Sequence, residues 1–312
     1  MLIRAALIGL SFNAVVVMGK GLPPVLLTSL RFFIAAAAML PLFLLGPRRL
    51  PARPEMMIYW ILGVCQALFF GGMFLAAHGT PAVTLTVVYI SVPFLTYCFG
   101  IPFGVERQSI RMLAILATGA IGALGIAWAE NSIGRHGPAG SLISGAGVGL
   151  FFAGCIGMAV YAVISKWGIA RHRLPDGAVV RTFWSLVTAA ILAGACGLLV
   201  EQPAALHHLD RSDLLLLLYL GVLSTSGTFY LQQRATPFLS PAAVSAYSYA
   251  PPFFTMLLLF VTEPGTISWR WAPGALLVLL TIGLLLRANG EPDRPRGRPG
   301  ASGDGQNHPF GK

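Results

Sequence analysis

The sequence has very little charge for its length. Of its 312 residues, 10% are charged and 56% are hydrophobic, and its mean hydropathy is +0.75. A soluble globular domain typically carries about 25% charged residues. So few charges cannot cover the surface of a soluble globule, and a disordered chain would need the opposite composition. The composition therefore excludes a typical cytosolic enzyme and indicates a polytopic helical membrane protein.

Cysteine is also scarce, and several sequence motifs are missing. The four cysteines lie in apolar runs without C-x-x-C spacing, which argues against a zinc site or a disulfide framework. The G-x-x-x-x-G-K-[ST] pattern of ATP-driven proteins is absent, as are the H-E-x-x-H and G-x-S-x-G patterns of hydrolytic enzymes. We therefore expect no cofactor, no metal and no enzymatic activity.

Long apolar runs are abundant. A helix that crosses a bilayer needs about 20 mostly apolar residues. The sequence predicts ten such spans, and the first lacks the small-x-small site at which a signal peptide is cleaved, so we expect it to be retained. The predicted spans lie near residues 3–20, 23–46, 56–77, 81–104, 109–129, 142–166, 175–200, 212–233, 237–261 and 271–288.

Basic residues are distributed unevenly between the two sides of these spans. An even number of spans places both termini on one side of the membrane, and Lys and Arg favour the cytoplasmic side. With the N-terminus inside, 16 of the 21 Lys and Arg fall in inner segments, 4 fall in outer segments, and Arg31 lies within a span. The net charge of +10 therefore indicates membrane orientation, with both termini cytoplasmic, rather than nucleic-acid binding.

The chain resembles itself at an offset of about 156–158 residues. The matching features are Thr80-Pro81 with Thr236-Pro237, Pro93 with Pro251, and Glu106 with Glu263. Each half holds five spans, and because five is odd the second half is inverted relative to the first. Inverted repeats are typical of secondary transporters, whose substrate site lies at the repeat interface. The predicted parts are a first repeat at 1–130, an outer linker at 131–141, a second repeat at 142–289, and a disordered cytoplasmic tail at 290–312.

These features resemble the EamA repeat of the drug/metabolite transporter superfamily over about residues 5–288. Within that superfamily the chain is most similar to the YddG-type aromatic amino acid exporters. The similar pieces are Leu7-Ile8-Gly9-Leu10, Tyr89-Ile90-Ser91-Val92-Pro93 and Ser165-Lys166-Trp167. The resemblance implies an all-α polytopic membrane protein of the bacterial inner membrane, with ten transmembrane helices around a central cavity. The chain departs from the family at Asn13-Ala14-Val15, where a tryptophan is often found.

No carboxylate lies in the middle of a predicted span. All eleven Asp and Glu residues fall at span ends, in loops or in the tail. This distribution argues against a buried Asp/Glu proton relay or a carboxylate-based sodium site. We therefore expect facilitative transport by alternating access, or coupling through a group of another kind.

Polar and aromatic residues within spans are the candidate substrate contacts, because polar groups are costly inside a bilayer. Gln66 is the strongest candidate, since it lies mid-span on one helical face with Phe70 and Met73. The other predicted substrate-binding residues are Asn13, His78, Thr84, Val88, Tyr89, Ser91, Met158, Tyr161, Ser165, Lys166, Ser224, Thr228, Ser245, Ser248 and Tyr249. Structural roles are the alternative, such as a helix–helix hydrogen bond for Gln66 or a snorkelling anchor for Lys166.

Two prolines and one arginine within spans complete the predictions. Pro93 and Pro251 are predicted hinges, because proline removes a backbone hydrogen bond and bends a helix. We expect Arg31 to snorkel outward or to pair with backbone carbonyls, in a role shared with its repeat mate Arg181. The nearly apolar fifth and tenth spans are expected at the rim of the bundle.

The leading functional hypothesis is export of aromatic and other apolar amino acids by rocking of the two halves. A drug, nucleoside or other small-metabolite exporter on the same fold is the alternative. An intramembrane enzyme is disfavoured because the spans contain no catalytic constellation. The expected partners are a small-molecule substrate and the lipid bilayer, without nucleic acid, and the sequence leaves the oligomeric state open.

Overall fold

The computed structural model describes only part of the chain. The described residues are 1–18, 22–46, 49–77, 82–132, 146–254, 257 and 269–290. Within these ranges the chain forms helices and no strand. The predicted site residue His78, the linker from residue 133 and the tail from residue 291 lie outside them.

The first half of the chain folds into helices that follow the predicted spans. They are α1 (Leu2–Met18), α2 (Pro24–Leu45), α3 (Arg53–Ala77), α4 (Ala82–Tyr89), α5 (Ser91–Gly100) and α6 (Ile110–Ser132). The fourth predicted span is divided at Ile90 into α4 and α5. Pro93 accounts for this break, because it has no N–H to donate to the carbonyl of Tyr89 one turn earlier.

The second half contains more irregular helices. They are α7 (Ala146–Ala170), α8 (Ala178–Val200), η2 (Pro203–His208), α9 (Arg211–Tyr219), η3 (Leu220–Gly227), α10 (Thr228–Ala235), α11 (Pro241–Ala246), η4 (Tyr247–Tyr249), η6 (Trp269–Trp271) and α13 (Ala272–Gly290). The segment η3 is a π-helix between α9 and α10, and the sequence did not predict it.

One predicted helix start is wrong. The Thr236-Pro237 pair follows α10, where the Thr236 N–H donates to the Gln232 carbonyl at 2.9 Å. The next helix begins at Pro241, and the Ser240 hydroxyl accepts a hydrogen bond from the Ala243 N–H. Ser240 is therefore the N-cap, since a serine hydroxyl satisfies a free N–H of the first helical turn.

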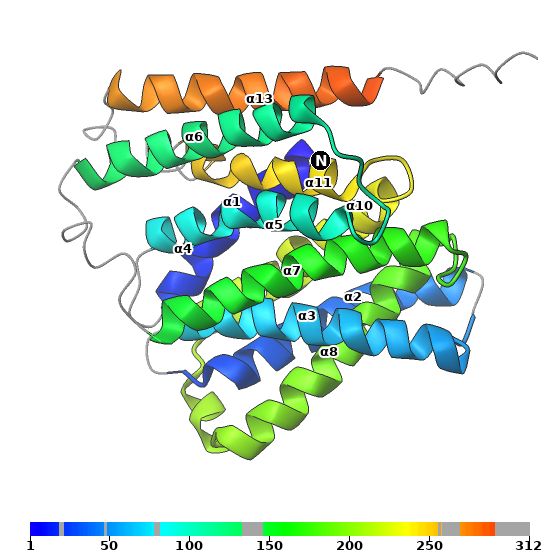
Figure 1. The fold of residues 1–312 in the computed structure, drawn as a ribbon. Coiled ribbons are helices and arrows are strands. Elements are labelled where there is room, and N and C mark those ends of the chain that lie inside the picture. The colour runs from blue at the N-terminus through cyan, green and yellow to red at the C-terminus, as the bar shows by residue number, and fades with distance from the viewer. Residues whose placement is uncertain are drawn as a thin grey trace, which may run out of the picture.

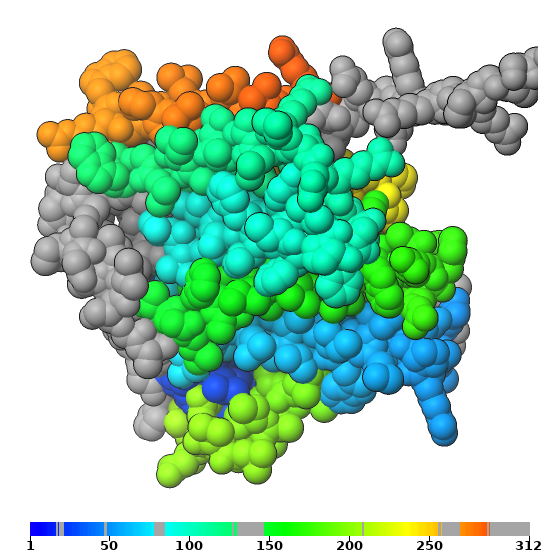
Figure 2. Space-filling view, in the orientation of Figure 1, coloured from blue at the N-terminus to red at the C-terminus, as the bar shows by residue number. Residues whose placement is uncertain are grey.

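The helices stack in layers from α13 at one edge to α8 at the other (Figure 1). Contacts join α13 with α6, α5 with α11, α5 with α7, α7 with α3, and α3 and α2 with α8. The space-filling view shows the same succession of bands (Figure 2). The nearly apolar helices α6 and α13 thus form one edge of the bundle, as the sequence predicts.

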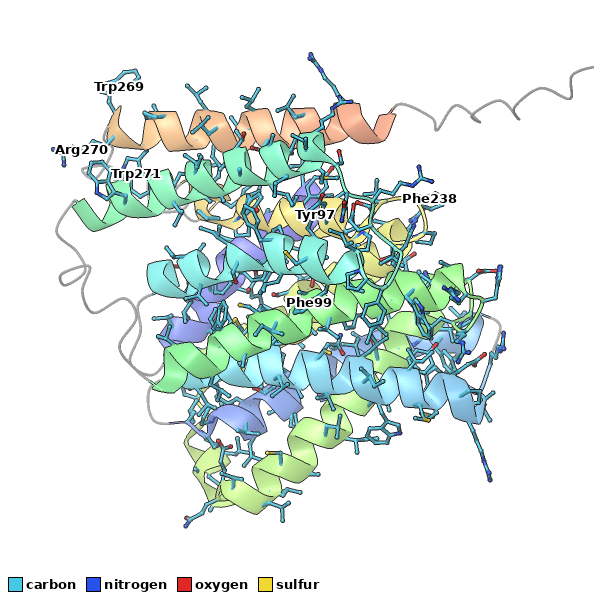
Figure 3. All side chains as sticks on the ribbon, viewed as in Figure 1. Tyr97, Phe99, Phe238, Trp269, Arg270 and Trp271 are labelled. Carbon is cyan, nitrogen blue, oxygen red and sulfur yellow. The ribbon has the colours of Figure 1, made fainter. Side chains whose placement is uncertain are left out.

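The outer surface is apolar in the way a bilayer requires. Large apolar side chains such as Leu45, Ile110 and Leu199 are more than four-fifths exposed, which a soluble protein rarely allows. Five helical stretches are long and apolar enough to cross a membrane, namely 24–45, 53–77, 147–170, 178–200 and 211–235. Trp269 and Phe238 project at opposite ends of the bundle (Figure 3), where aromatic residues favour a membrane interface.

Half-buried carboxylates that follow one helix cap the start of another. The Glu201 carboxylate accepts hydrogen bonds from the N–H groups of Val25 (2.9 Å) and Leu26 (2.8 Å) at the start of α2. The Glu106 carboxylate accepts from the Ala242 N–H at 3.0 Å at the start of α11. Burial raises the pKa of Glu106, while the bond from Ala242 opposes that shift by stabilising the anion. Both carboxylates complement the partial positive charge of a helix N-terminus.

Small residues allow α3 and α7 to approach closely. A Cβ atom added to Gly154 would lie 2.6 Å from the Cα of Phe69. A Cβ atom on Gly72 would lie 2.9 Å from the Leu150 carbonyl oxygen. Glycine at such crossings brings backbones together, and in a bilayer this packing replaces the hydrophobic effect as a source of stability.

We predict that Gly154→Ala destabilises the protein, because its methyl group would meet backbone atoms of α3. The expected loss is about 1–3 kcal/mol, typical of overpacking. Gly149→Ala is the matched control, since no atom lies within 4 Å of its added Cβ on the same helix. Thermal unfolding of both purified variants in detergent measures the effect. Equal melting temperatures for the two would show that this contact does not limit helix packing.

Candidate functional site

A small cavity lies between helices of both halves of the chain. Its volume is about 10 Å³, roughly the space of one water molecule. The cavity is lined by Arg4, Ile8, Ser11, Phe12, Phe69, Phe70, Met73, Tyr89, Met158, Ser224, Thr228 and Phe229. Six of these are predicted site residues, namely Phe70, Met73, Tyr89, Met158, Ser224 and Thr228. The structure therefore brings residues predicted from four separate spans to one place.

Aromatic rings close one side of the cavity. We call Phe12, Phe69, Tyr89 and Phe151 the aromatic cluster. The ring centroids of Phe12 and Tyr89 lie 5.6 Å apart, and those of Phe69 and Phe151 lie 5.4 Å apart. Phe151 lies near the start of α7, which is the predicted outer end of that helix. Such contacts between large rings exclude water from the cavity on that side.

A buried polar network lies toward the opposite end of the helices. We call Tyr161, Ser165, Arg181 and Gln233 the polar network. The Gln233 amide nitrogen donates to the Tyr161 hydroxyl (2.8 Å) and to the Ser165 hydroxyl (3.1 Å). Arg181 donates from Nε to the Gln233 amide oxygen (3.1 Å) and from Nη2 to the Gln233 carbonyl (2.7 Å). The network joins α7, α8 and α10, and it includes two predicted site residues, Tyr161 and Ser165.

A larger vestibule lies beyond the polar network. Its volume is about 530 Å³, and its lining comes from the end of α2, the start of α8 and the end of α10. Arg181 lines this vestibule and binds Gln233, while the adjacent Gln232 binds Arg4 of the cavity lining. The polar network therefore borders the vestibule through Arg181, and Gln232 next to it contacts the cavity lining through Arg4, at the predicted inner end of the helices.

Arg31 is fully buried rather than snorkelling, which corrects its sequence-based prediction. Its Nε donates to the Thr225 hydroxyl at 2.6 Å, and its Nη2 donates to the Ser224 hydroxyl at 3.0 Å. Its Cζ lies 4.2 Å from the centroid of the Phe70 ring, a cation–π contact. Ser224 and Thr225 belong to the π-helix η3, and π turns are rare and frequent at functional sites.

Gln66 and Asn13 have polar atoms without a partner. Both amide atoms of Gln66 and the Asn13 amide nitrogen are buried and lack a hydrogen bond within the described part of the chain. Gln66 is fully buried one helical turn before Phe70, which lines the cavity. A helix–helix hydrogen bond for Gln66, the structural alternative, is thus not formed in this conformation.

The remaining predicted site residues whose side chains the structure describes lie away from the cavity lining. Lys166 donates to the carbonyls of Thr236 and Pro237 at 2.9 Å each, so it fastens the end of α10 to α7. Ser91 donates to the Val88 carbonyl of its own helix at 2.7 Å, and Val88 is half-buried. The others are Ser245, which bonds Thr96 of α5, and Ser248 and Tyr249, which are buried in η4. Thr84 lies in α4, and its side chain is outside the described part.

Arg4 lines the cavity, but it was not predicted from the sequence as a site residue. Its Nη2 donates to the Gln232 amide oxygen at 2.8 Å, and the side chain is 3% exposed. Arg4 was counted only as a charge that orients the membrane, because its position near the chain start resembles an ordinary inner segment. The signal in the sequence was its place within the first apolar run.

The structural findings on cysteines and metal sites cover the described residues alone. Cys65 and Cys155 are buried free thiols, and Cys98 and Cys196 are exposed on the apolar outer surface. No cluster of His, Cys, Asp and Glu suited to a metal ion occurs among the residues that the structure places.

A bundle of apolar helices around a small, mostly apolar cavity is typical of membrane transporters, and comparisons support this class. Residues 145–287 match the EamA-like transporter family. A solved crystal structure, described without a function, shares the fold with a TM-score of 0.69 at 22% sequence identity. That similarity covers 92% of this chain and 96% of the other.

Similar proteins include inner membrane transporters of Escherichia coli. The uncharacterized inner membrane transporter YedA of strain K12 is 26% identical over 240 residues, which is 76% of this chain and 72% of YedA. YedA of strain O157:H7 matches equally. These findings support a multi-pass inner membrane transporter whose second half matches the EamA-like family. They do not extend to the aromatic amino acid exporters, so that resemblance stays a prediction.

We predict opposite stability effects for two glutamine variants. Gln66→Leu should raise the melting temperature, because it removes a buried amide without partners, a cost of about 1–3 kcal/mol. Gln233→Leu is the matched comparison. It should lower the melting temperature, because the Arg181 and Tyr161 side chains lose a hydrogen-bond partner. Thermal unfolding in detergent distinguishes the two variants. A destabilised Gln66→Leu would mean that the Gln66 amide is already satisfied within the protein.

Proposed function

We propose that the protein is a secondary transporter built from two inverted five-helix repeats, which exports small metabolites across the bacterial inner membrane by alternating access. The observation that carries the proposal is the small cavity, whose lining comes from α1, α3, α4, α7, η3 and α10. In inverted-repeat transporters the substrate site lies at the interface of the two halves. The cavity has this position if the repeats are divided as the sequence predicts.

Packing between predicted repeat mates supports the inverted arrangement. Under that division α2 corresponds to α8, the α4–α5 pair to α11 and η4, and α6 to α13. In the structure α2 packs against α8, α5 against α11, and α6 against α13. A two-fold axis between the halves brings corresponding helices together in this way. The mates Arg31 and Arg181 are both fully buried, in α2 and α8.

The route across the protein is proposed to have two gates. The vestibule of about 530 Å³ reaches the polar network, while the aromatic cluster closes the other side of the cavity. Opening one gate while the other stays closed gives alternating access. Pro93 follows the break between α4 and α5, and Pro251 follows η4, so both lie where a helix is already interrupted.

Aromatic and other apolar amino acids are the first substrates to test. The rings of Phe12, Phe69, Phe70, Tyr89 and Phe229 line the cavity beside polar hydroxyls, which suits a substrate with an apolar body and a polar head. Drugs, nucleosides and other small metabolites are the second candidates on the same fold. The described carboxylates lie at helix ends rather than mid-helix, which favours facilitative movement with the gradient.

We predict measurable transport by the purified protein in liposomes. Labelled phenylalanine or tryptophan should equilibrate faster than in empty liposomes, and unlabelled substrate on the opposite side should accelerate it by counterflow. Flux equal to that of empty liposomes for amino acids, nucleosides and organic acids alike would contradict the proposal.

Filling the cavity should block that flux. Met73→Trp places a larger side chain in the small cavity. We expect transport to fall at least tenfold, because the substrate and the indole compete for the same space. Ile61→Trp is the matched control, because Ile61 is exposed on the outer surface of the same helix. Melting temperatures of both variants report whether they fold. Equal transport by folded Met73→Trp and the control would exclude this cavity as the route.

We further predict that Pro93→Ala slows transport. Alanine restores the hydrogen bond to the Tyr89 carbonyl and joins α4 to α5, which stiffens the proposed hinge. Pro41→Ala is the control, because Pro41 lies inside α2 on the exposed side. The expected result is a several-fold lower turnover for Pro93→Ala with an unchanged or higher melting temperature. Unchanged turnover would remove Pro93 from the hinge.

A further inference from the structure

Two arginines beside the cavity carry charge without a counter-ion. Arg4 and Arg31 are 3% and 0% exposed. Within the described ranges no carboxylate lies within ion-pair distance of either guanidinium, and the ion pair found there joins Arg49 and Glu55. The Arg4 Nε and Nη1 atoms and the Arg31 Nη1 atom are buried without a hydrogen-bond partner.

This arrangement is costly unless a ligand completes it. A guanidinium stays charged at any physiological pH, and a buried charge needs an opposite charge and filled hydrogen bonds. Arg181 provides the contrast, because its three nitrogens all donate hydrogen bonds. Asp176 also lines the vestibule beside Arg181. Satisfied and unsatisfied arginines therefore occur in the same bundle, and the unsatisfied ones flank the cavity.

The two arginines are held at the two ends of one helical face. Ser224, Thr228 and Gln232 are spaced four residues apart, so they share a face of η3 and α10. Arg31 binds Ser224 at one end of this face, and Arg4 binds Gln232 at the other. At 1.5 Å per residue the ends lie roughly 12 Å apart. Ser224 and Thr228 line the cavity between them.

The rest of the cavity lining is apolar apart from Ser11, whose hydroxyl bonds the Ile8 carbonyl of its own helix. Five aromatic rings line it together with Met73 and Met158, and none of its lining residues is acidic. An ammonium group would therefore meet two fixed positive charges and no carboxylate. An anionic head would meet free N–H donors, and the aromatic rings would contact an apolar body.

We propose that the cavity, when it widens during the transport cycle, takes an organic anion, with its carboxylate on the free N–H groups of Arg4 and its apolar body against the aromatic rings. Arg31 keeps the far end of the cavity positive and repels a cationic substituent. A guanidinium holds a carboxylate through charge-assisted hydrogen bonds from N–H groups in fixed directions, which a freely rotating ammonium does not provide. The inference rests on the proposed transport function and refines its substrate class, from zwitterionic amino acids to monocarboxylates with an apolar body.

Three ligands with the same phenyl body separate the charge classes. They are 3-phenylpropanoate, phenylalanine and phenethylamine, which carry a carboxylate, both groups, and an ammonium. Isothermal titration of the purified full-length protein in detergent should give at least tenfold tighter binding of 3-phenylpropanoate than of phenylalanine, and no binding of phenethylamine. Phenyl phosphate distinguishes a phosphate site from a carboxylate site, and tighter binding of phenyl phosphate would overturn the carboxylate assignment.

Arginine variants test which side chain holds the anion. Arg4→Gln keeps an N–H group that can donate to the Gln232 amide oxygen, but it loses the positive charge. 3-Phenylpropanoate should therefore bind at least tenfold more weakly, while the melting temperature stays equal or rises. Arg4→Lys restores the positive charge without the planar guanidinium, and it should recover part of the affinity for 3-phenylpropanoate. Arg107→Gln, an exposed arginine outside the helices, is the control and should change nothing. Unchanged affinity in folded Arg4→Gln would overturn the assignment of Arg4.

The outcomes separate this inference from the proposed function. Phenylalanine flux in liposomes together with 3-phenylpropanoate binding no tighter than phenylalanine would overturn the anion site and leave transport standing. Absence of binding by all four ligands would contradict the anion site directly. Absence of flux for organic acids and amino acids alike would contradict transport itself.

Discussion

The fold follows from one constraint, namely that a bilayer offers no water to hydrogen-bond a polar group. Helices satisfy their own backbones, and the described hydroxyls often bond backbone carbonyls of their own helix. Thr28, Thr96 and Thr281 do so with the residue four positions earlier. The described carboxylates lie at helix ends or in loops, where Glu106 and Glu201 cap other helices. The same constraint makes each unpartnered buried polar atom informative.

Five of those unpartnered atoms belong to Arg4, Arg31 and Gln66 at or beside the cavity, while Tyr59, Ser248 and Tyr249 carry others away from its lining. Arg4 lines it, Arg31 contacts Ser224 and Phe70 of its lining, and Gln66 precedes Phe70 by one turn. By contrast, the side chains of the polar network (Tyr161, Ser165, Arg181 and Gln233) find their hydrogen-bond partners within the protein. A structural group is satisfied by the protein, whereas a binding group is satisfied by its ligand. This difference is the physical basis on which we separate the gate from the substrate site.

Hydropathy predicted the helices well, because apolar length is a local property of the sequence. Six residues of the cavity lining were predicted for a similar reason, since Phe70, Met73 and Ser224 follow from helical spacing and the cost of polar groups. The burial of Arg31 could not be predicted, because its partners lie more than 190 residues away in a π turn. Arg4 was missed likewise, since only its distant partner Gln232 reveals that it faces inward. The Thr236-Pro237 pair misled because a Thr-Pro pair also suits the residues that follow a helix.

The central claim is that this cavity opens alternately to the two sides of the membrane. Cysteine accessibility tests it most directly, with Met73→Cys in a variant whose four native cysteines are replaced by alanine or serine. A membrane-impermeant thiol reagent should label this cysteine from either side in oriented vesicles, and transported substrate should protect it. Labelling from one side only, or from neither, would contradict alternating access at this site.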